Sequence, residues 1–375
     1  MSVSAPEQTA VAGVRLFTRA PITLGWLSRS VVPVTRALRD SGRALVHLRR
    51  GWLHGPHVDI VGRQLDPTGA VWRDVAAKLD AGPTDPATEL TDEAYLAQAR
   101  ELGRLEAIEP PYLPMREHGA TELLLGRHLA SREPALDPLR EVVLGVLARP
   151  LIDTIDGIVA DPASAPLLLA EAFVALADTH TLGVDYGSFS FRSHAEAFLA
   201  WAGPTTQVRP TFARRLAGEE EMFRTVVSQR LSGQPSRNAA AWRTAFAYCA
   251  GTLDSAVAAG TLTVPMLDAI FDDVDTSHMG PPGAPDVVPT GPHPDSEFHA
   301  TVAESGVVAQ PSKWFAGYRL LVNLFYQQLP LLTVSPLQRY YTCHAVAETV
   351  DAVSGDSWRE LLAGERARWA GTGVR

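Results

Sequence analysis

The sequence lacks several residue types and patterns, and each absence excludes a class of protein. Its two cysteines, Cys249 and Cys343, are too few for a disulfide scaffold or a four-cysteine zinc site. The most apolar run, residues 166–177, is short and contains Glu171, whereas a membrane-spanning helix needs about 20 apolar residues. The N-terminal residues lack the basic start and apolar block of a signal peptide. These absences favour a soluble, cytoplasmic protein.

Common catalytic motifs are also absent. The chain contains no GxxxxGK[ST], GxGxxG, HExxH, GxSxG or CxxC pattern, so the usual nucleotide-binding, zinc-dependent and serine-hydrolase activities have no sequence support. The acidic segment 271–275, followed by His278, has carboxylates that could bind a divalent ion. A solvated turn beside a helix end explains it better.

Charge is unevenly distributed along the chain. The net charge is −9, but the first 63 residues hold nine arginines against three acidic residues, which leaves this segment at +6 and the remainder at −15. An arginine-rich segment can bind an anionic partner through bidentate hydrogen bonds. An acidic body repels nucleic acid and no recognition motif is present, so an acidic peptide fits better; a solvated helix face explains the arginines equally well. The candidate peptide-binding residues are Arg29, Arg36, Arg39, Arg43, Arg49 and Arg50.

Hydrophobic periodicity predicts an α+β fold that is predominantly helical, with a small antiparallel sheet formed early in the chain. Residues 43–52 and 57–63 are typical of a β-hairpin around Gly55-Pro56, and 121–126 of a further strand. Pro33 should kink or divide a helix over 23–40. Residues 276–294 are rich in proline and glycine and should form a loop. Further helices are expected at 70–79, 91–102, 137–160, 165–178, 193–202, 211–232, 237–258, 264–273, 294–305, 312–329, 336–353 and 356–369.

The segment 184–196 contains the first candidate site. Ser193 and Glu196 have the S-x-x-E spacing of a capping box, which predicts that a helix begins at Ser193. The preceding residues would then lie beside a positive helix end, where N–H groups can polarise a carbonyl. A tyrosine there can exchange a proton, although each hydroxyl could equally satisfy a local loop hydrogen bond. The candidate catalytic residues are Tyr186, Ser188, Ser190 and His194.

The second candidate site is a helix expected to open at Ser312. Its predicted core face consists of Phe315, Tyr318, Val322, Phe325 and Leu329. A polar stripe is formed by Arg319, Asn323, Tyr326 and Gln327. Solvated helix faces usually favour Glu and Lys, so this donor-rich stripe favours binding of peptide amides or of a developing oxyanion.

Residues 318–350 resemble the C-terminal signature of the thiopeptide-type bacteriocin biosynthesis family, which is related to the glutamate-elimination domain of class I lanthipeptide dehydratases. The matching residues are Arg319, Asn323, Tyr326, Ser335, Pro336 and Arg339. Residues 55–58 resemble the family's early G-x-H strand, and Tyr186-Gly187 followed by 193–198 resembles its R-Y-G-G…S/A-E-x-x-F element. The resemblance implies a single elimination-domain-like domain over residues 1–375.

Departures from the family pattern refine this interpretation. Asp59 and Val61 stand where the elimination domains have two strand arginines, and Asp185 precedes Tyr186. Neither Asp nor Val can replace a carboxylate-binding guanidinium, which argues against glutamate elimination. The resemblance then points to thiopeptide pyridine synthases, which perform a formal [4+2] aza-cycloaddition of two dehydroalanines in a precursor peptide, with loss of water and of the leader peptide.

That resemblance implies that no metal or organic cofactor is needed, and it implies a role for each candidate residue. Tyr186 would act as acid or base, Ser188 and Ser190 would contact the reacting amide, and His57 or His194 would assist. The stripe of Arg319, Asn323, Tyr326 and Gln327 would orient the core peptide. The arginine-rich residues 1–65 would bind the acidic leader of a ribosomally made precursor with a dehydroalanine- and thiazole-containing core; a homodimer is compatible with this arrangement. Two alternatives remain: a glutamate-eliminating subunit of a split dehydratase, and a non-catalytic leader-binding partner subunit.

Overall fold

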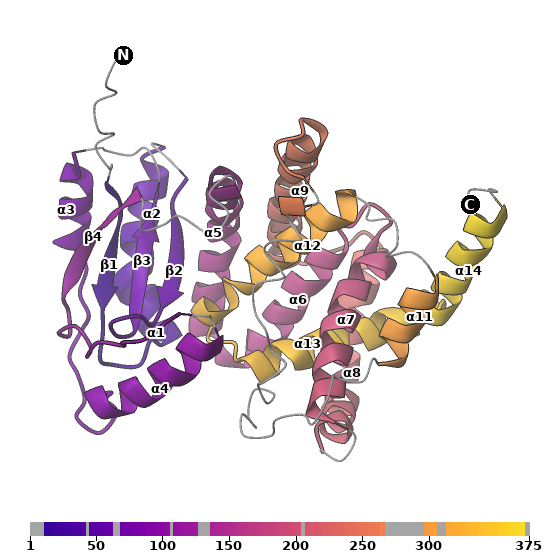
Figure 1. Ribbon diagram of the computed structural model, residues 1–375, viewed down its shortest axis with the longest axis horizontal. Coiled ribbons are helices and arrows are strands. Elements are labelled where there is room, and N and C mark those ends of the chain that lie inside the picture. The colour runs from indigo at the N-terminus through magenta and orange to yellow at the C-terminus, as the bar shows by residue number, and fades with distance from the viewer. Residues whose placement is uncertain are drawn as a thin grey trace. The chain divides into compact units, whose positions relative to one another are not determined.

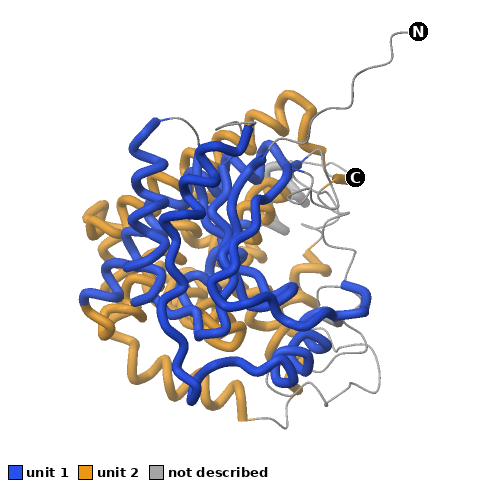
Figure 2. The backbone as a smooth tube through the Cα atoms, turned by 90° about the vertical axis from the view of Figure 1, so that its left-hand side faces the viewer, with its two compact units in different colours: residues 1–160, 268–274, 324–333 blue, residues 161–267, 275–323, 334–375 orange. Residues whose placement is uncertain are grey.

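The computed structural model describes residues 11–42, 45–62, 68–105, 108–126, 136–203, 207–263, 265–266, 296–305 and 313–371. The chain divides into two compact units, shown in different colours in Figure 2. Unit 1 comprises residues 1–160, 268–274 and 324–333, and unit 2 comprises 161–267, 275–323 and 334–375. Arg43, the acidic segment 271–275 with His278, and the loop expected at 276–294 lie outside the described residues. The single-domain organisation stays a prediction.

Unit 1 contains a four-stranded antiparallel sheet in the order β2-β3-β1-β4 (Figure 1). The strands are β1 (Val11–Phe17), β2 (His47–Gly51), β3 (His57–Val61) and β4 (Thr121–Leu125). Pairing of Gly51 with His57 confirms the predicted hairpin. The sequence analysis missed β1, which lies between β3 and β4. Five of its seven residues are buried, so it lacks the alternation that marks a strand with one solvated face.

The helices of unit 1 largely follow the predicted pattern. The segment expected at 23–40 is divided into α1 (Leu24–Trp26), a π-helical turn (Leu27–Val31) and α2 (Val32–Asp40). Pro33 lies in the first turn of α2, where no intrahelical N–H donor is needed, which confirms the predicted division. The unit also contains α3 (Ala70–Ala76), α4 (Asp92–Leu105), α5 (Asp137–Ala160) and a 3₁₀ turn (Leu329–Leu332).

The regular secondary structure described in unit 2 is all helical. Its helices are α6 (Ala165–Ala177), α7 (Val184–Ala202), α8 (Val208–Leu231), α9 (Arg237–Ala258), α11 (Glu297–Ser305), α12 (Lys313–Tyr326, whose last three residues fall in unit 1), α13 (Pro336–Ser354) and α14 (Trp358–Gly371). Helix α7 packs along α13 and against α6, α8 and α11. Within the described ranges, no helix has the length and apolar character needed to span a membrane.

The predicted helix start at Ser193 is wrong. Helix α7 begins nine residues earlier, at Val184, and Ser193 lies in its interior. The two residues of the expected capping box have other partners: the Ser193 hydroxyl is 3.0 Å from Nε2 of His299, and Glu196 accepts a 2.7 Å hydrogen bond from Arg209. The S-x-x-E spacing therefore reflects two separate tertiary contacts.

Close packing against α6 fixes the first turns of α7. A Cβ atom added at Gly187 would lie 2.0 Å from the carbonyl oxygen of Ala177, so only glycine allows this approach. Phe191, one turn later, is completely buried and packs on Phe173. Tertiary packing thus makes the serine- and phenylalanine-rich segment helical without a strong local signal.

Candidate functional site

One face of α7 brings together three of the four predicted catalytic residues. Tyr186, Ser190 and His194 recur every four residues and lie along one line, spanning about 12 Å of the helix axis. Tyr186 is in the first turn and half-buried, Ser190 is 6% exposed, and His194 is half-buried. We refer to these three residues as the α7 face.

Aromatic contacts orient the ring of Tyr186. It stacks on the His180 ring at an interplanar angle of 14° and a centroid distance of 6.3 Å, and it contacts Phe189 at 5.5 Å. His180 also meets Tyr318 edge-on at 5.0 Å, and the Tyr318 hydroxyl donates a 3.0 Å hydrogen bond to the carbonyl of Gly187. Helix α12 is thereby fixed against the start of α7.

His180 was missed by the sequence analysis because it lies outside the segment that carries the motif. Burial lowers the pKa of His180 to about 4, so the ring is neutral at pH 7. Its Nδ1 accepts a 3.2 Å hydrogen bond from the backbone N–H of Leu182. This places the ring proton on Nε2, and His180 beside Tyr186 is a neutral N–H donor.

His194 lies in a positive electrostatic environment. Burial, followed by the effects of Arg339, Arg319 and His299, lowers its pKa to about 3. These three residues come from α13, α12 and α11. Helices α13 and α11 pack against α7, and the Tyr318 hydrogen bond joins α12 to it, so four helices of unit 2 meet along α7. The neutral His194 ring offers one N–H donor and one acceptor nitrogen at pH 7.

Aromatic stacking holds Arg339 beside α7. The Phe198 ring, one turn after His194, is parallel to Tyr340 with centroids 4.3 Å apart. The Arg339 guanidinium lies over the same Tyr340 ring, 4.6 Å from its centroid. When a guanidinium stacks on a ring, its N–H groups point outward in the guanidinium plane, where a carboxylate or amide oxygen can accept hydrogen bonds from them.

A hydrogen-bonded chain of Ser193, His299 and Ser296 lies next to His194. The two serine hydroxyls flank the ring, 3.0 Å from Nε2 and 2.7 Å from Nδ1 of His299. Ser296 also accepts from the backbone N–H of His299 and so caps α11. The sequence analysis missed His299; the only local signal for the cap was that Ser296 stands three residues before it, which is the spacing of an N-cap serine and the N–H that it accepts from.

The hydroxyl of Ser188 is engaged within α7. It is 1% exposed and donates a 2.7 Å hydrogen bond to the carbonyl of Asp185. The Asp185 carboxylate in turn accepts a hydrogen bond from Ser354 on α13. Ser188 therefore lies off the α7 face, in the packing of the helix.

The predicted stripe on α12 is less uniform than expected. Arg319 and Asn323 are half-buried in unit 2, with the Asn323 amide donating to the Arg319 carbonyl at 3.0 Å. Tyr326 is 8% exposed, and Gln327, beyond the helix end, accepts a 3.4 Å bond from Arg140 within unit 1. Of the predicted core face, Tyr318, Val322, Phe325 and Leu329 are buried, whereas the prediction for Phe315 is wrong because it is 36% exposed.

His57 lies in the core of unit 1. Its ring is 3% exposed, its Nδ1–H donates to the Gly55 carbonyl at 2.8 Å, and it meets Phe17 edge-on. Burial lowers the pKa of His57 to about 4. These contacts give the ring a structural role in the hairpin.

The Asp59 carboxylate forms an ion pair with an arginine on the neighbouring strand. The Arg15 guanidinium on β1 forms two hydrogen bonds to its carboxylate, at 2.8 and 3.0 Å. The two residues are direct partners in the sheet, and Asp59 is 4% exposed. The position where the family resemblance expects an arginine is thus part of a buried ion pair.

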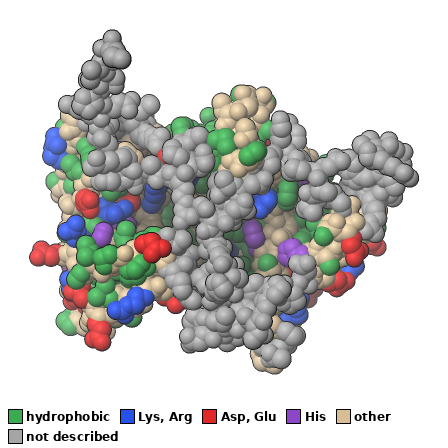
Figure 3. All heavy atoms as spheres, in the orientation of Figure 1, with side chains coloured by type: hydrophobic (Ala, Val, Ile, Leu, Met, Phe, Trp, Pro, Cys, Tyr) green, Lys and Arg blue, Asp and Glu red, His purple; other side chains and the backbone are tan. Residues whose placement is uncertain are grey.

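The described candidate leader-binding arginines are tied into unit 1. Two of them form ion pairs: Arg36 with Asp153 and Asp156, and Arg49 with Glu141. Two donate to backbone carbonyls: Arg39 to Val46 and Gly145, and Arg50 to Pro330. Arg29 lies in the π-helical turn. On the face seen in Figure 3, basic and acidic side chains of this unit are intermingled. Leader binding by these residues stays a prediction.

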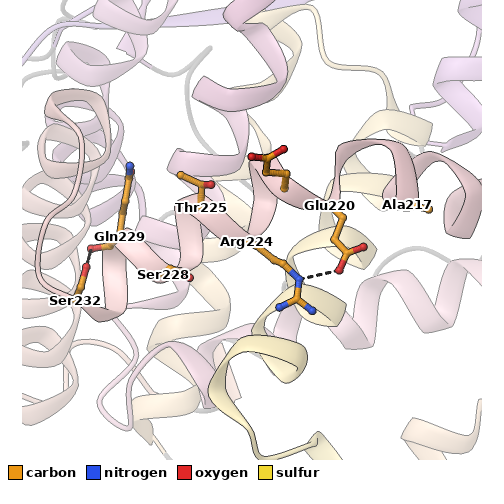
Figure 4. Close-up of a pocket in the computed structure, with 8 residues that line it drawn as sticks. Ala217, Glu220, Arg224, Thr225, Ser228, Gln229 and Ser232 are labelled. Carbon is orange, nitrogen blue, oxygen red and sulfur yellow. Dashed lines mark hydrogen bonds and ion pairs between the residues drawn. The ribbon is translucent and has the colours of Figure 1, made fainter.

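A surface hollow of about 680 Å³ runs along α8 (Figure 4). It is lined by Ala217, Glu220, Glu221, Arg224, Thr225, Ser228, Gln229 and Ser232. None of these is a candidate catalytic residue, and Glu220 pairs with Arg224. Among the described residues, no three His, Cys, Asp or Glu side chains lie close enough to hold a metal ion.

The fold and the α7 face define a mainly helical α+β protein whose hydroxyl- and imidazole-bearing helix is flanked by arginines. No family model and no curated protein sequence matches the chain. Among solved structures, it is similar to the pyridine synthase TbtD from thiomuracin biosynthesis, with a TM-score of 0.64 and 20% identity over 92% of this chain and 99% of that one. It is also similar to TsrL, with a TM-score of 0.59 and 16% identity over 94% and 97% of the two chains. At these identities the comparison establishes a shared fold.

Proposed function

We propose that this protein is an enzyme of thiopeptide biosynthesis that forms a pyridine ring by a formal [4+2] aza-cycloaddition of two dehydroalanines. The observation that carries the proposal is the fold shared with a pyridine synthase over 92% of the chain. The α7 face adds support, because it presents a phenol, a hydroxyl and a neutral imidazole in one line.

The reaction balances without an oxidant or reductant. One dehydroalanine, with its preceding amide as the imidic acid tautomer, supplies the four-atom azadiene, and the second dehydroalanine supplies two carbons. Two carbon–carbon bonds form. Loss of the former amide oxygen as water, and of the leader peptide as its carboxamide, then leaves an aromatic pyridine. Each elimination requires a proton on the leaving group and removal of a proton from the ring.

The protein's contribution is orientation and proton transfer. A peptide lying along the 12 Å of the α7 face would have three or four extended residues in contact with it. Fixing both alkenes in one geometry can provide most of the acceleration. Tyr186 would protonate the amide or leaving oxygen, and neutral His194 would hydrogen-bond the reacting amide. Arg319 and Asn323 would orient the core.

Two contacts disfavour the glutamate-eliminating alternative. Asp59 is already paired with Arg15, so this position on β3 lacks the unpaired positive charge that a glutamyl carboxylate needs. Asp185, in place of the family's arginine before Tyr186, adds a negative charge and is bonded to Ser354.

Mass spectrometry of the protein incubated with a linear, thiazole-containing, bis-dehydroalanine precursor carrying its leader tests the proposal. We expect a macrocycle together with released leader carboxamide. Unchanged peptide that nevertheless binds would contradict the proposed reaction and favour the partner-subunit alternative. Turnover of a glutamylated peptide would favour glutamate elimination.

Replacing Tyr186 by Phe removes the phenol while keeping the stacked ring. We expect turnover to fall by about 100-fold or more, which is typical of the loss of a general acid, with peptide binding unchanged. The matched control is Tyr248→Phe, because Tyr248 is 62% exposed on α9 and should have no effect. A Tyr186→Phe protein with full activity would exclude Tyr186 as the acid.

A further inference from the structure

Arg319 and Arg339 approach the α7 face from two different helices. The hydrogen bond from Tyr318 to Gly187 fixes α12 against α7, and Arg319 is the next residue. The stack of Phe198, Tyr340 and Arg339 fixes the start of α13 against the same helix. Together with burial, both guanidinium charges lower the pKa of His194, which lies on this face.

Ser190 provides an independent observation at this location. It is 6% exposed, one turn before His194, and its Oγ has no hydrogen-bond partner in the structure. Buried hydroxyls are nearly always hydrogen-bonded, so this one calls for a partner. A hydroxyl, a neutral imidazole and two guanidiniums form a set dominated by donors, which suits an acceptor-only group.

We infer that the α7 face, together with Arg319 and Arg339, binds a carboxylate of the peptide substrate. A carboxylate matches the planar fork of a guanidinium, and its remaining lone pairs can accept from Ser190. The net charge of −9 disfavours a long polyanion, so a single carboxylate on a peptide fits better than nucleic acid. This inference rests on the proposed function for the identity of the peptide.

The carboxylate has two sources in such a peptide: its C-terminus, or an acidic side chain of the leader. Three fluorescein-labelled linear peptides, in which alanine replaces one of the two dehydroalanines so that no ring can form, separate them in an anisotropy titration. The first ends in a free carboxylate, the second in a carboxamide, and the third keeps the free C-terminus with each leader Asp and Glu changed to Asn and Gln.

We expect the wild-type protein to bind the free acid at least about 10-fold more tightly than one of the other two peptides, as expected for a charge-assisted hydrogen bond. Weaker binding of the carboxamide assigns the site to the C-terminus, and weaker binding of the amidated leader assigns it to an acidic side chain. Equal affinity for all three peptides would overturn the inference.

Arg339→Gln and Arg319→Gln should each reduce this preference, while the exposed Arg214→Gln on α8 should keep it. A preference unchanged in both site variants would also overturn the inference. Circular dichroism melts check that each variant is folded. Because binding is measured without turnover, a preserved preference in a protein that forms no pyridine would refute the reaction and leave the carboxylate site standing.

Discussion

At the scale of single residues, the ion pair of Arg15 and Asp59 shows one feature that could be predicted from the sequence and one that could not. The departure at Asp59 was visible as a missing arginine. Its partner was not, because Arg15 lies 44 residues away on the strand that the sequence analysis missed. A pair made across a sheet depends on strand order, which the local sequence pattern does not encode.

Breaking this ion pair should destabilise the protein strongly. Asp59→Ala leaves the Arg15 guanidinium, which is only 19% exposed, without its carboxylate, and we expect a loss of about 3 kcal/mol in the free energy of unfolding. Asp153→Ala removes one partner of the exposed Arg36 and should cost less than about 1 kcal/mol. Urea denaturation of both variants compares them, and equal losses would show that the Arg15–Asp59 pair contributes little.

At the scale of secondary-structure elements, long helices were predictable and their functional ends were not. The bounds predicted for α5 are those observed, because the helical spacing of apolar residues is easiest to recognise over a segment as long as 24 residues. The start of α7 was misplaced because Ser193 and Glu196 imitate a cap, while the real determinant is the contact of Gly187 with the α6 backbone. That error placed Tyr186 in a loop instead of on the helix that aligns it with His194.

A methyl group at Gly187 should therefore disrupt the α7 face. In Gly187→Ala the added Cβ would overlap the Ala177 carbonyl, which cannot move without shifting α6, so we expect the loss of at least about 2 kcal/mol of stability together with activity. Gly218→Ala in α8 has open space around its Cβ and should stabilise by about 0.5–1 kcal/mol. Thermal melts distinguish the two. A neutral Gly187→Ala would mean that the helices can separate at little cost.

At the scale of the whole molecule, buried histidines in both units should make the stability of the protein depend on pH. His57 in unit 1 and His180 and His194 in unit 2 each have a lowered pKa, about 4, 4 and 3, chiefly because burial disfavours the charged ring. Each is neutral at pH 7. The sequence gives their positions, but not their burial, because neighbours distant in the chain provide it.

Acidification should therefore destabilise the folded protein well above the pH at which carboxylates titrate. The folded state binds fewer protons at these histidines than the unfolded chain, whose histidines titrate near 6.5, so the free energy of unfolding falls as the pH falls from 6.5 toward 4. Each such histidine contributes at most about 1.4 kcal/mol per pH unit in that window. His180→Phe keeps an aromatic ring beside Tyr186 and Tyr318 but cannot titrate, so its stability should depend on pH by about 1 kcal/mol per unit less than that of the wild type. Urea denaturation at pH 7, 6 and 5 measures this difference, and identical slopes for the two proteins would show that His180 is protonated as readily in the folded state as in the unfolded chain.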